Sequence, residues 1–184
     1  MLTFAVYVQD HPGVLNRVAS LFRRRAFNIE SLTVGHTERA GVSRMTIVVD
    51  APETVRARIE ANLYKLVEVE RIESIPIATA LHRDLALIKV AASQTLRSEV
   101  MQLVHVFRAR VVDVAPESLV VEITGTEDKI DGLLDVLRPY GVLEMVRTGR
   151  VAMTRGAGAG DTGDRAGDPL AADDTLPTGV SYSV

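Results

Sequence analysis

In residues 2–9 large apolar side chains alternate with smaller or more polar ones, which is the pattern of a strand with one buried face. The apolar members are Leu2, Phe4, Val6 and Val8. Pro12 and Gly13 interrupt the alternation, and the apolar residues after them recur at the spacing of one helix face. These residues are Val14, Leu15, Val18, Leu21 and Phe22. We predict a strand, a turn and then a helix that ends at three consecutive arginines, where positive charge favours the helix dipole.

Two more extended segments follow at residues 31–37 and 43–49, joined by a short loop at residues 38–41. Pro52 suits the first turn of a second helix, which carries its own apolar stripe. Residues 67–75 then return to a strand pattern. The predicted order is βαββαβ within about 75 residues, which is the ferredoxin-like plan.

The same order recurs after residues 77–83, which we interpret as a linker. Strands are predicted at residues 85–92, 110–114, 119–124 and 142–148, and helices near residues 96–107 and 130–137. We therefore predict an α+β protein with two tandem ferredoxin-like domains, at residues 1–76 and 84–155. Residues 156–184 are rich in Gly, Ala, Asp, Thr and Pro without apolar periodicity, so we expect a disordered tail.

Composition excludes several kinds of site. The chain of 184 residues has no cysteine, which rules out disulfides, thiolate zinc sites and cysteine nucleophiles. Its formal net charge is −3, and the segment from Gly156 onward holds five Asp and one Arg. The remaining 20 basic and 19 acidic residues leave a nearly neutral body, which argues against nucleic-acid binding through bulk charge. Neither a signal peptide nor an apolar run of membrane-spanning length is evident, so we expect a cytoplasmic protein.

The stretch around Gly13 has the chemistry of a small-molecule site. A helix start leaves backbone N–H groups without partners and carries partial positive charge, and a residue without Cβ lets a carboxylate approach them. Asp10 can accept hydrogen bonds from an α-ammonium group, or it can cap the helix. We expect Asn28 to bring a neutral amide to the same point and Ile29 to line a small apolar pocket. The turn by itself is equally typical of an ordinary strand-to-helix connection.

Longer motifs carry a resemblance to a known family. The run Asp-His-Pro-Gly-Val-Leu at residues 10–15, in a βαββαβ frame, resembles an ACT domain, a module that senses small molecules. The run Asn-Ile-Glu-Ser-Leu-Thr-Val at residues 28–34, followed by Ser-Arg-Met-Thr-Ile at residues 43–47, resembles the regulatory (small) subunit of acetolactate synthase, also called acetohydroxyacid synthase. The agreement continues at residues 66–69, 83–90, 107–114 and 125–126, and it covers residues 1–155.

The resemblance implies an effector site. In that family two N-terminal ACT domains pair, and a branched-chain amino acid, most often valine, binds at their interface near the helix starts. Carried onto this chain, the effector-binding residues are Asp10, His11, Pro12, Gly13, Val14, Leu15, Asn28 and Ile29. Backbone N–H groups at residues 13–15 would meet the carboxylate, while Asp10 and Asn28 would serve the ammonium group or bridging polar contacts. Many family members have Asn at the position of Asp10 and a residue other than proline at the position of Pro12.

The resemblance also implies partners. The chain would be a non-catalytic homodimer that binds the large catalytic subunit, raises its activity and confers feedback inhibition in valine, leucine and isoleucine biosynthesis. Thiamine diphosphate, Mg²⁺ and FAD would belong to that catalytic partner, and this chain would hold no cofactor.

Other functions find less support in the residues. An RNA-recognition module shares the strand order but needs exposed aromatic residues on its central strands, and residues 43–49 contain none. Histidine spacing does not suggest a metal site at His11, His36, His82 or His105. We find neither a nucleophile–base pair nor a Gly-rich phosphate loop after a strand. A free-standing ACT-repeat sensor that regulates another target is the alternative that stays open.

Overall fold

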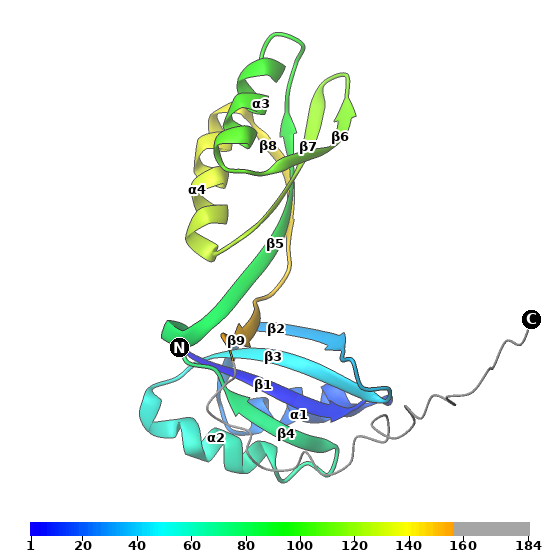
Figure 1. The fold of residues 1–184 in the computed structure, drawn as a ribbon, viewed down its shortest axis with the longest axis vertical. Helices are drawn as coiled ribbons and strands as arrows, with labels where there is room; N and C mark the ends of the chain where they lie inside the picture. The colour runs from blue at the N-terminus through cyan, green and yellow to red at the C-terminus, as the bar shows by residue number, and fades with distance from the viewer. Residues whose placement is uncertain (157–184) are drawn as a thin grey trace, which may run out of the picture.

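A computed structural model of the chain describes residues 1–156. Figure 1 shows two domains stacked along the long axis, with one long strand leading from the first into the second. No helix within residues 1–156 is long and apolar enough to cross a membrane. The tail that we expect to be disordered lies, beyond Gly156, outside the described residues.

The first domain is a four-stranded antiparallel sheet with two helices on one face (Figure 1). Its elements are β1 (Leu2–Gln9), α1 (Val14–Arg24), β2 (Asn28–His36), β3 (Val42–Asp50), the 3₁₀ turn η1 (Glu53–Val55), α2 (Arg56–Leu63) and β4 (Val69–Ser74). The strand order β2-β3-β1-β4 leaves β2 at an edge. Alternate side chains of β1 and β3 meet the apolar stripes of both helices in one core, as the two periodicities predict.

The second domain repeats this plan. It comprises β5 (Ala80–Ala91), α3 (Arg97–Val106), β6 (Arg110–Ala115), β7 (Ser118–Gly125), α4 (Glu127–Leu137), the turn η3 (Arg138–Tyr140) and β8 (Val142–Arg147), with strand order β6-β7-β5-β8. A separate core holds alternate residues of β5 and β7 against α3 and α4. The predicted fold class, two ferredoxin-like βαββαβ units in tandem, is confirmed.

The structure differs from the expected linker at residues 77–83. Residues Ile77–Thr79 form a 3₁₀ turn, η2, and β5 already begins at Ala80. The first four residues of β5 pair with β9 (Val151–Thr154), a strand that we did not predict. Ala80 and Ala152 pack with Ala5 and Ile75 on the face of the first sheet opposite its helices. The small side chains allow the paired strands β5 and β9 to lie close to the first sheet. Residues 80–83, which we expected to be a linker, are therefore part of a two-stranded antiparallel pair.

Candidate functional site

The start of helix α1 is open to solvent. Gly13 is the N-cap residue with φ +94°, and no side chain caps the helix. The first backbone hydrogen bond runs from the Arg17 N–H to the Gly13 oxygen at 3.0 Å. The N–H groups of residues 14–16 therefore lack intrahelical partners. A Cβ built on Gly13 would meet nothing within 4 Å, so there is room in front of these donors for a carboxylate.

Asp10 does not cap this helix. Its Oδ2 atom lies 3.2 Å from Nδ1 of His36, and its backbone N–H donates to the Gly41 oxygen at 2.8 Å. His11 is exposed, and its ring nitrogens lie 3.3 Å from Gln9 Oε1 and 3.5 Å from the Pro12 oxygen. The Asp10 carboxylate, three residues before Gly13, is thus not used by the helix, and its side chain is 42% exposed and open to a ligand cation.

The two apolar residues at the helix start point in different directions. Val14 is 4% exposed and belongs to the core, so it can offer a ligand only its backbone N–H. Leu15 is 45% exposed. An apolar ligand group at this helix start would find Leu15 rather than Val14.

Asn28 and Ile29 lie at the other end of the sheet. Gln9, at the end of β1, pairs with Val42 at the start of β3, whereas Asn28 pairs with Asp50 at the end of β3. Eight residues of strand separate the two positions, which is about 26 Å. The expectation that the turn and Asn28 meet at one point is not met within one chain, because the 11-residue helix α1 runs between them. Ile29 packs against the core rather than lining a free pocket.

Known proteins match nearly all of the described chain. Residues 4–71 match the family model described as the AHAS small subunit-like ACT domain, and residues 83–156 match the model for the small subunit of acetolactate synthase. The chain is 50% identical over 154 residues to the probable acetolactate synthase small subunit of Archaeoglobus fulgidus, covering 84% of this chain and 96% of that protein. The chain belongs to the acetolactate synthase small-subunit family.

Two further relatives agree with this assignment. The acetolactate synthase small subunit of Mycobacterium leprae is 53% identical over 154 residues, covering 84% of this chain and 91% of that one. The crystal structure of the small subunit from Thermotoga maritima superposes with a TM-score of 0.80 at 39% identity, covering 84% of this chain and 97% of the other. The Thermotoga maritima small subunit therefore shares the two-domain architecture described above.

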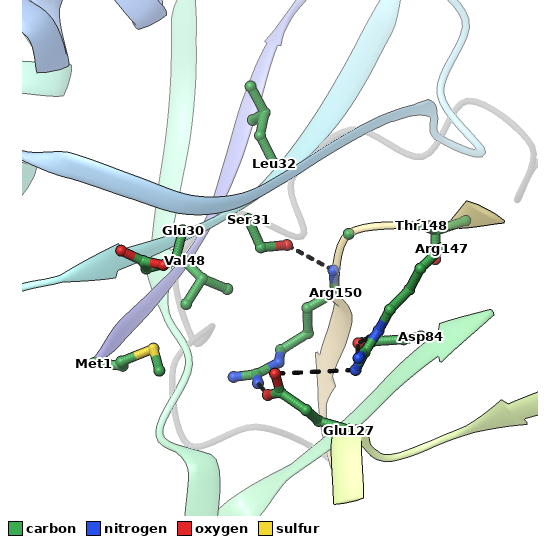
Figure 2. Close-up of a pocket in the computed structure, with 11 residues that line it drawn as sticks. Met1, Glu30, Ser31, Leu32, Val48, Asp84, Glu127, Arg147, Thr148 and Arg150 are labelled. Atoms are coloured by element: carbon green, nitrogen blue, oxygen red, sulfur yellow. Dashed lines mark hydrogen bonds and ion pairs between the residues drawn. The ribbon is translucent and has the colours of Figure 1, made fainter. Parts of the chain in front are cut away.

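A pocket of about 440 Å³ lies between the two domains of this small-subunit chain (Figure 2). The first domain contributes Met1, Glu30, Ser31, Leu32 and Val48, and the second contributes Asp84, Glu127, Arg147, Thr148, Gly149 and Arg150. Its lining holds three carboxylates and two guanidinium groups, so side chains of both charge signs face the pocket. The pocket adjoins the Asn28 end of β2 because Glu30 and Ser31 follow Asn28 in that strand.

An ion-pair network forms one wall of the pocket. Arg147 donates from Nε and Nη2 to Oδ2 of Asp84 at 3.0 and 2.6 Å, and from Nη1 to Asp131 Oδ1 at 3.0 Å. Burial lowers the pKa of Arg147, but the hydrogen bond to Asp84 and the charges of Asp84, Asp131 and Glu127 raise the pKa above its ordinary value. Arg150 donates from Nη2 to Glu127 Oε2 at 3.0 Å.

Sequence reasoning missed this network. Arg147 and Asp84 are 63 positions apart, so no local pattern links them. No group of three or more His, Cys, Asp or Glu side chains that could hold a metal ion occurs within residues 1–156.

Proposed function

We propose that this chain is the regulatory subunit that binds the large catalytic subunit of acetolactate synthase, raises its activity and confers feedback inhibition by a branched-chain amino acid. Valine is the first candidate effector. Thiamine diphosphate, Mg²⁺ and FAD belong to the catalytic partner in this proposal. Family membership supports the partnership, and the open start of helix α1 is the single observation that supports effector binding.

The chemistry of the helix start suits an amino acid. The free N–H groups after Gly13 offer hydrogen bonds and partial positive charge to an α-carboxylate. Asp10 carries a negative charge beside them, which suits an α-ammonium group. The exposed side chain of Leu15 offers apolar contact to a branched side chain. The same turn thus offers a complementary group to the carboxylate, the ammonium group and the side chain of valine.

A second copy of the chain can supply what one copy lacks. Strand β2 is an edge strand, and an edge offers unpaired backbone groups to another strand. A two-fold axis at Leu32, the middle residue of β2, would pair two β2 strands antiparallel and place position 28 of one copy opposite position 36 of the other. His36 contacts Asp10, so Asn28 of the second copy would arrive beside the helix start. In this symmetric dimer, the helix start of one copy and Asn28 of the other copy would lie together and form one site.

Inhibition then follows from a difference in affinity. An effector that bridges two copies favours the arrangement in which both half-sites touch it. It inhibits only if that arrangement stimulates the catalytic subunit less than the effector-free one does. Couplings of this kind are about 1–3 kcal/mol.

The deciding experiment reconstitutes the complex. The small subunit is mixed with the large subunit from the same organism, and pyruvate condensation is followed with and without valine. Stimulation that falls on addition of valine is the expected result. Valine binding by the small subunit without binding to or stimulation of the large subunit would instead favour a free-standing ACT-repeat sensor.

A further inference from the structure

The residues between β8 and β9 connect the two domains closely. We call Thr148, Gly149 and Arg150 the bridge segment. Thr148 is tied to the second domain, because its backbone N–H donates to the Leu85 oxygen at 2.9 Å and its Oγ1 accepts from the Leu85 N–H at 3.0 Å. The bridge segment therefore begins at a fixed point on β5.

Gly149 brings the bridge segment against β2. A Cβ built on Gly149 would lie 2.6 Å from Ser31 Oγ and 3.1 Å from both the Leu32 oxygen and Thr33 Cγ2. Such distances are too short for a side-chain carbon beside a backbone atom, so only glycine fits without movement. The nearest atom belongs to the short Ser31 side chain, and the Leu32 oxygen belongs to the strand backbone, so neither is the tip of a long flexible side chain.

Arg150 fixes the same strand through both of its backbone groups. Its N–H donates to Ser31 Oγ at 2.7 Å, and its carbonyl oxygen accepts from Thr33 Oγ1 at 2.8 Å. Ser31 and Thr33 alternate along β2, so their side chains point to the same face of the sheet. Figure 2 shows the Ser31 contact and the long Arg150 side chain leading away from it.

The Arg150 side chain continues the connection into the second domain. It is 13% exposed and pairs with Glu127, the first residue of α4. Glu127 itself is 51% exposed, so the pair lies at the edge of the interface between the domains. A displacement of β2 that exceeds the tolerance of these hydrogen bonds therefore moves α4, breaks this pair or breaks the Ser31 and Thr33 hydrogen bonds.

The effector half-site lies on the same strand. The Asn28 side-chain amide donates to the Glu30 carboxylate, and a bulge follows between Ile29 and Ser31. Glu30 lines the same pocket as Arg150. A ligand that engages the Asn28 amide competes with Glu30, and the bulge lets this part of the strand adjust. Ser31, which the bridge segment contacts, comes directly after it.

We propose that Gly149 and Arg150 couple the effector half-site on β2 to the second domain, so that the bridge segment transmits the inhibitory signal. This inference rests on the proposed function. It assigns Gly149, Arg150 and Glu127 as positioning residues, because none of them touches the half-site directly. Breaking the bridge segment uncouples inhibition from effector binding.

Three variants test the coupling in the reconstituted complex. Gly149→Ala pushes the bridge segment away from β2, Thr33→Val removes one hydrogen bond at nearly constant shape, and Glu127→Gln weakens the pair with Arg150. We expect the valine concentration for half inhibition to rise about tenfold for Gly149→Ala and about threefold for the other two. Valine binding to the isolated small subunit, measured by calorimetry, should stay within about twofold of wild type.

Glu122→Gln is the matched control. Glu122 pairs with Arg110 at 2.6 Å in the same domain, between two strands that do not touch β2. This variant should inhibit like wild type. Thermal unfolding of each variant identifies any that fail to fold, and Thr33→Val, which changes no volume, keeps the test informative if Gly149→Ala does not fold.

The possible failures are distinguishable. Folded Gly149→Ala and Glu127→Gln proteins that keep the wild-type inhibition midpoint would overturn the role of the bridge segment. Variants that lose valine binding in isolation would show that these residues belong to the effector site instead, which also overturns the inference. A wild-type protein that neither stimulates the large subunit nor binds valine would overturn the proposed function itself.

Discussion

Gly13 and Asn28 lie at opposite ends of the first-domain sheet, although the sequence separates them by little more than one helix. Gly13 precedes α1 beside the end of β1, and Asn28 opens β2 beside Asp50 at the far end of β3. A ligand the size of valine cannot touch both within one chain, because about 26 Å of strand lies between them. If both residues bind the effector, two copies must share each site, and a monomer would be a poor sensor.

Replacing Gly13 with aspartate should abolish the effector response. The new carboxylate would occupy the open space where the ligand carboxylate is expected and would itself accept from the free N–H groups of α1. We expect valine affinity to fall at least about a hundredfold. Calorimetry with valine measures this directly.

Two controls separate charge from backbone strain in that experiment. A residue with Cβ at φ +94° costs about 1–2 kcal/mol whatever its charge. Gly13→Ala introduces the strain alone, and Gly141→Asp introduces the same change at φ +95° in the second domain. Both should bind valine far better than Gly13→Asp. Unchanged binding in Gly13→Asp would show that the effector binds elsewhere.

Mixed dimers should reveal whether each site is shared. We expect Gly13→Asp and Asn28→His homodimers to bind no valine at ordinary concentrations. A mixed dimer would carry both substitutions in one site and neither in the other, since each site takes Gly13 from one copy and Asn28 from the other. One valine per mixed dimer is therefore the expected stoichiometry. Sites contained within single chains would each carry one substitution, and the mixed dimer would then bind none.

The regular elements were predictable because their apolar periods are long. Large apolar residues alternate along the eight residues of β1, and the apolar stripe of α1 repeats over three helical turns. Patterns of this length identify a strand and a helix without knowledge of tertiary packing. Strand β9 has four residues, and its pairing with β5 depends on the fit of Ala80 and Ala152 against Ala5. A segment of four residues is too short for its hydrophobic pattern to predict this packing.

The candidate site was predictable only in part. Pro12 and Gly13 mark the helix start in the sequence, but the sequence also allows Asp10 to cap the helix, and only the structure shows that no side chain does so. The position of Asn28 depends on the length of α1, which at 11 residues carries the chain about 16 Å away before β2 begins. The Arg150 contacts depend on how the two domains pack, and the hydrophobic pattern along the sequence does not predict that packing.

The role of the Asp10 carboxylate can be tested by shape-conserving substitution. If Asp10 accepts a hydrogen bond from the effector ammonium, Asp10→Ala should weaken valine binding about tenfold or more, because a desolvated donor loses its partner. Asp10→Asn keeps an acceptor oxygen and should lose only about threefold. His36→Gln removes the neighbouring imidazole, 3.2 Å away, and serves as the control for local disturbance. Equal affinities for the Ala and Asn variants and wild type would exclude Asp10 from the site.

The Arg147–Asp84 pair should stabilise the second domain. The Asp84 side chain is 9% exposed and accepts two hydrogen bonds from Arg147, whose side chain is 21% exposed. Removing one partner from such a pair leaves the other poorly solvated, so we expect Asp84→Asn or Arg147→Met to lower the free energy of unfolding by about 2 kcal/mol. Urea denaturation followed by circular dichroism measures the change, and the exposed pair Arg138–Asp135 offers a control in which Asp135→Asn should cost less than about 0.5 kcal/mol.

The pH dependence of the Arg147 contribution gives a further check. Burial acts to lower the pKa of Arg147, but Asp84 and the nearby carboxylates raise that pKa above its ordinary value. A cation with a raised folded-state pKa contributes stability that is fully present below the unfolded-state pKa and is lost only as pH rises through the folded-state value. Both values lie far above neutrality, so the cost of Arg147→Met should be the same at about pH 6 and about pH 9. If the loss of unfolding free energy caused by Arg147→Met falls markedly between these pH values, another titrating group, rather than Arg147, controls the stability of this ion pair.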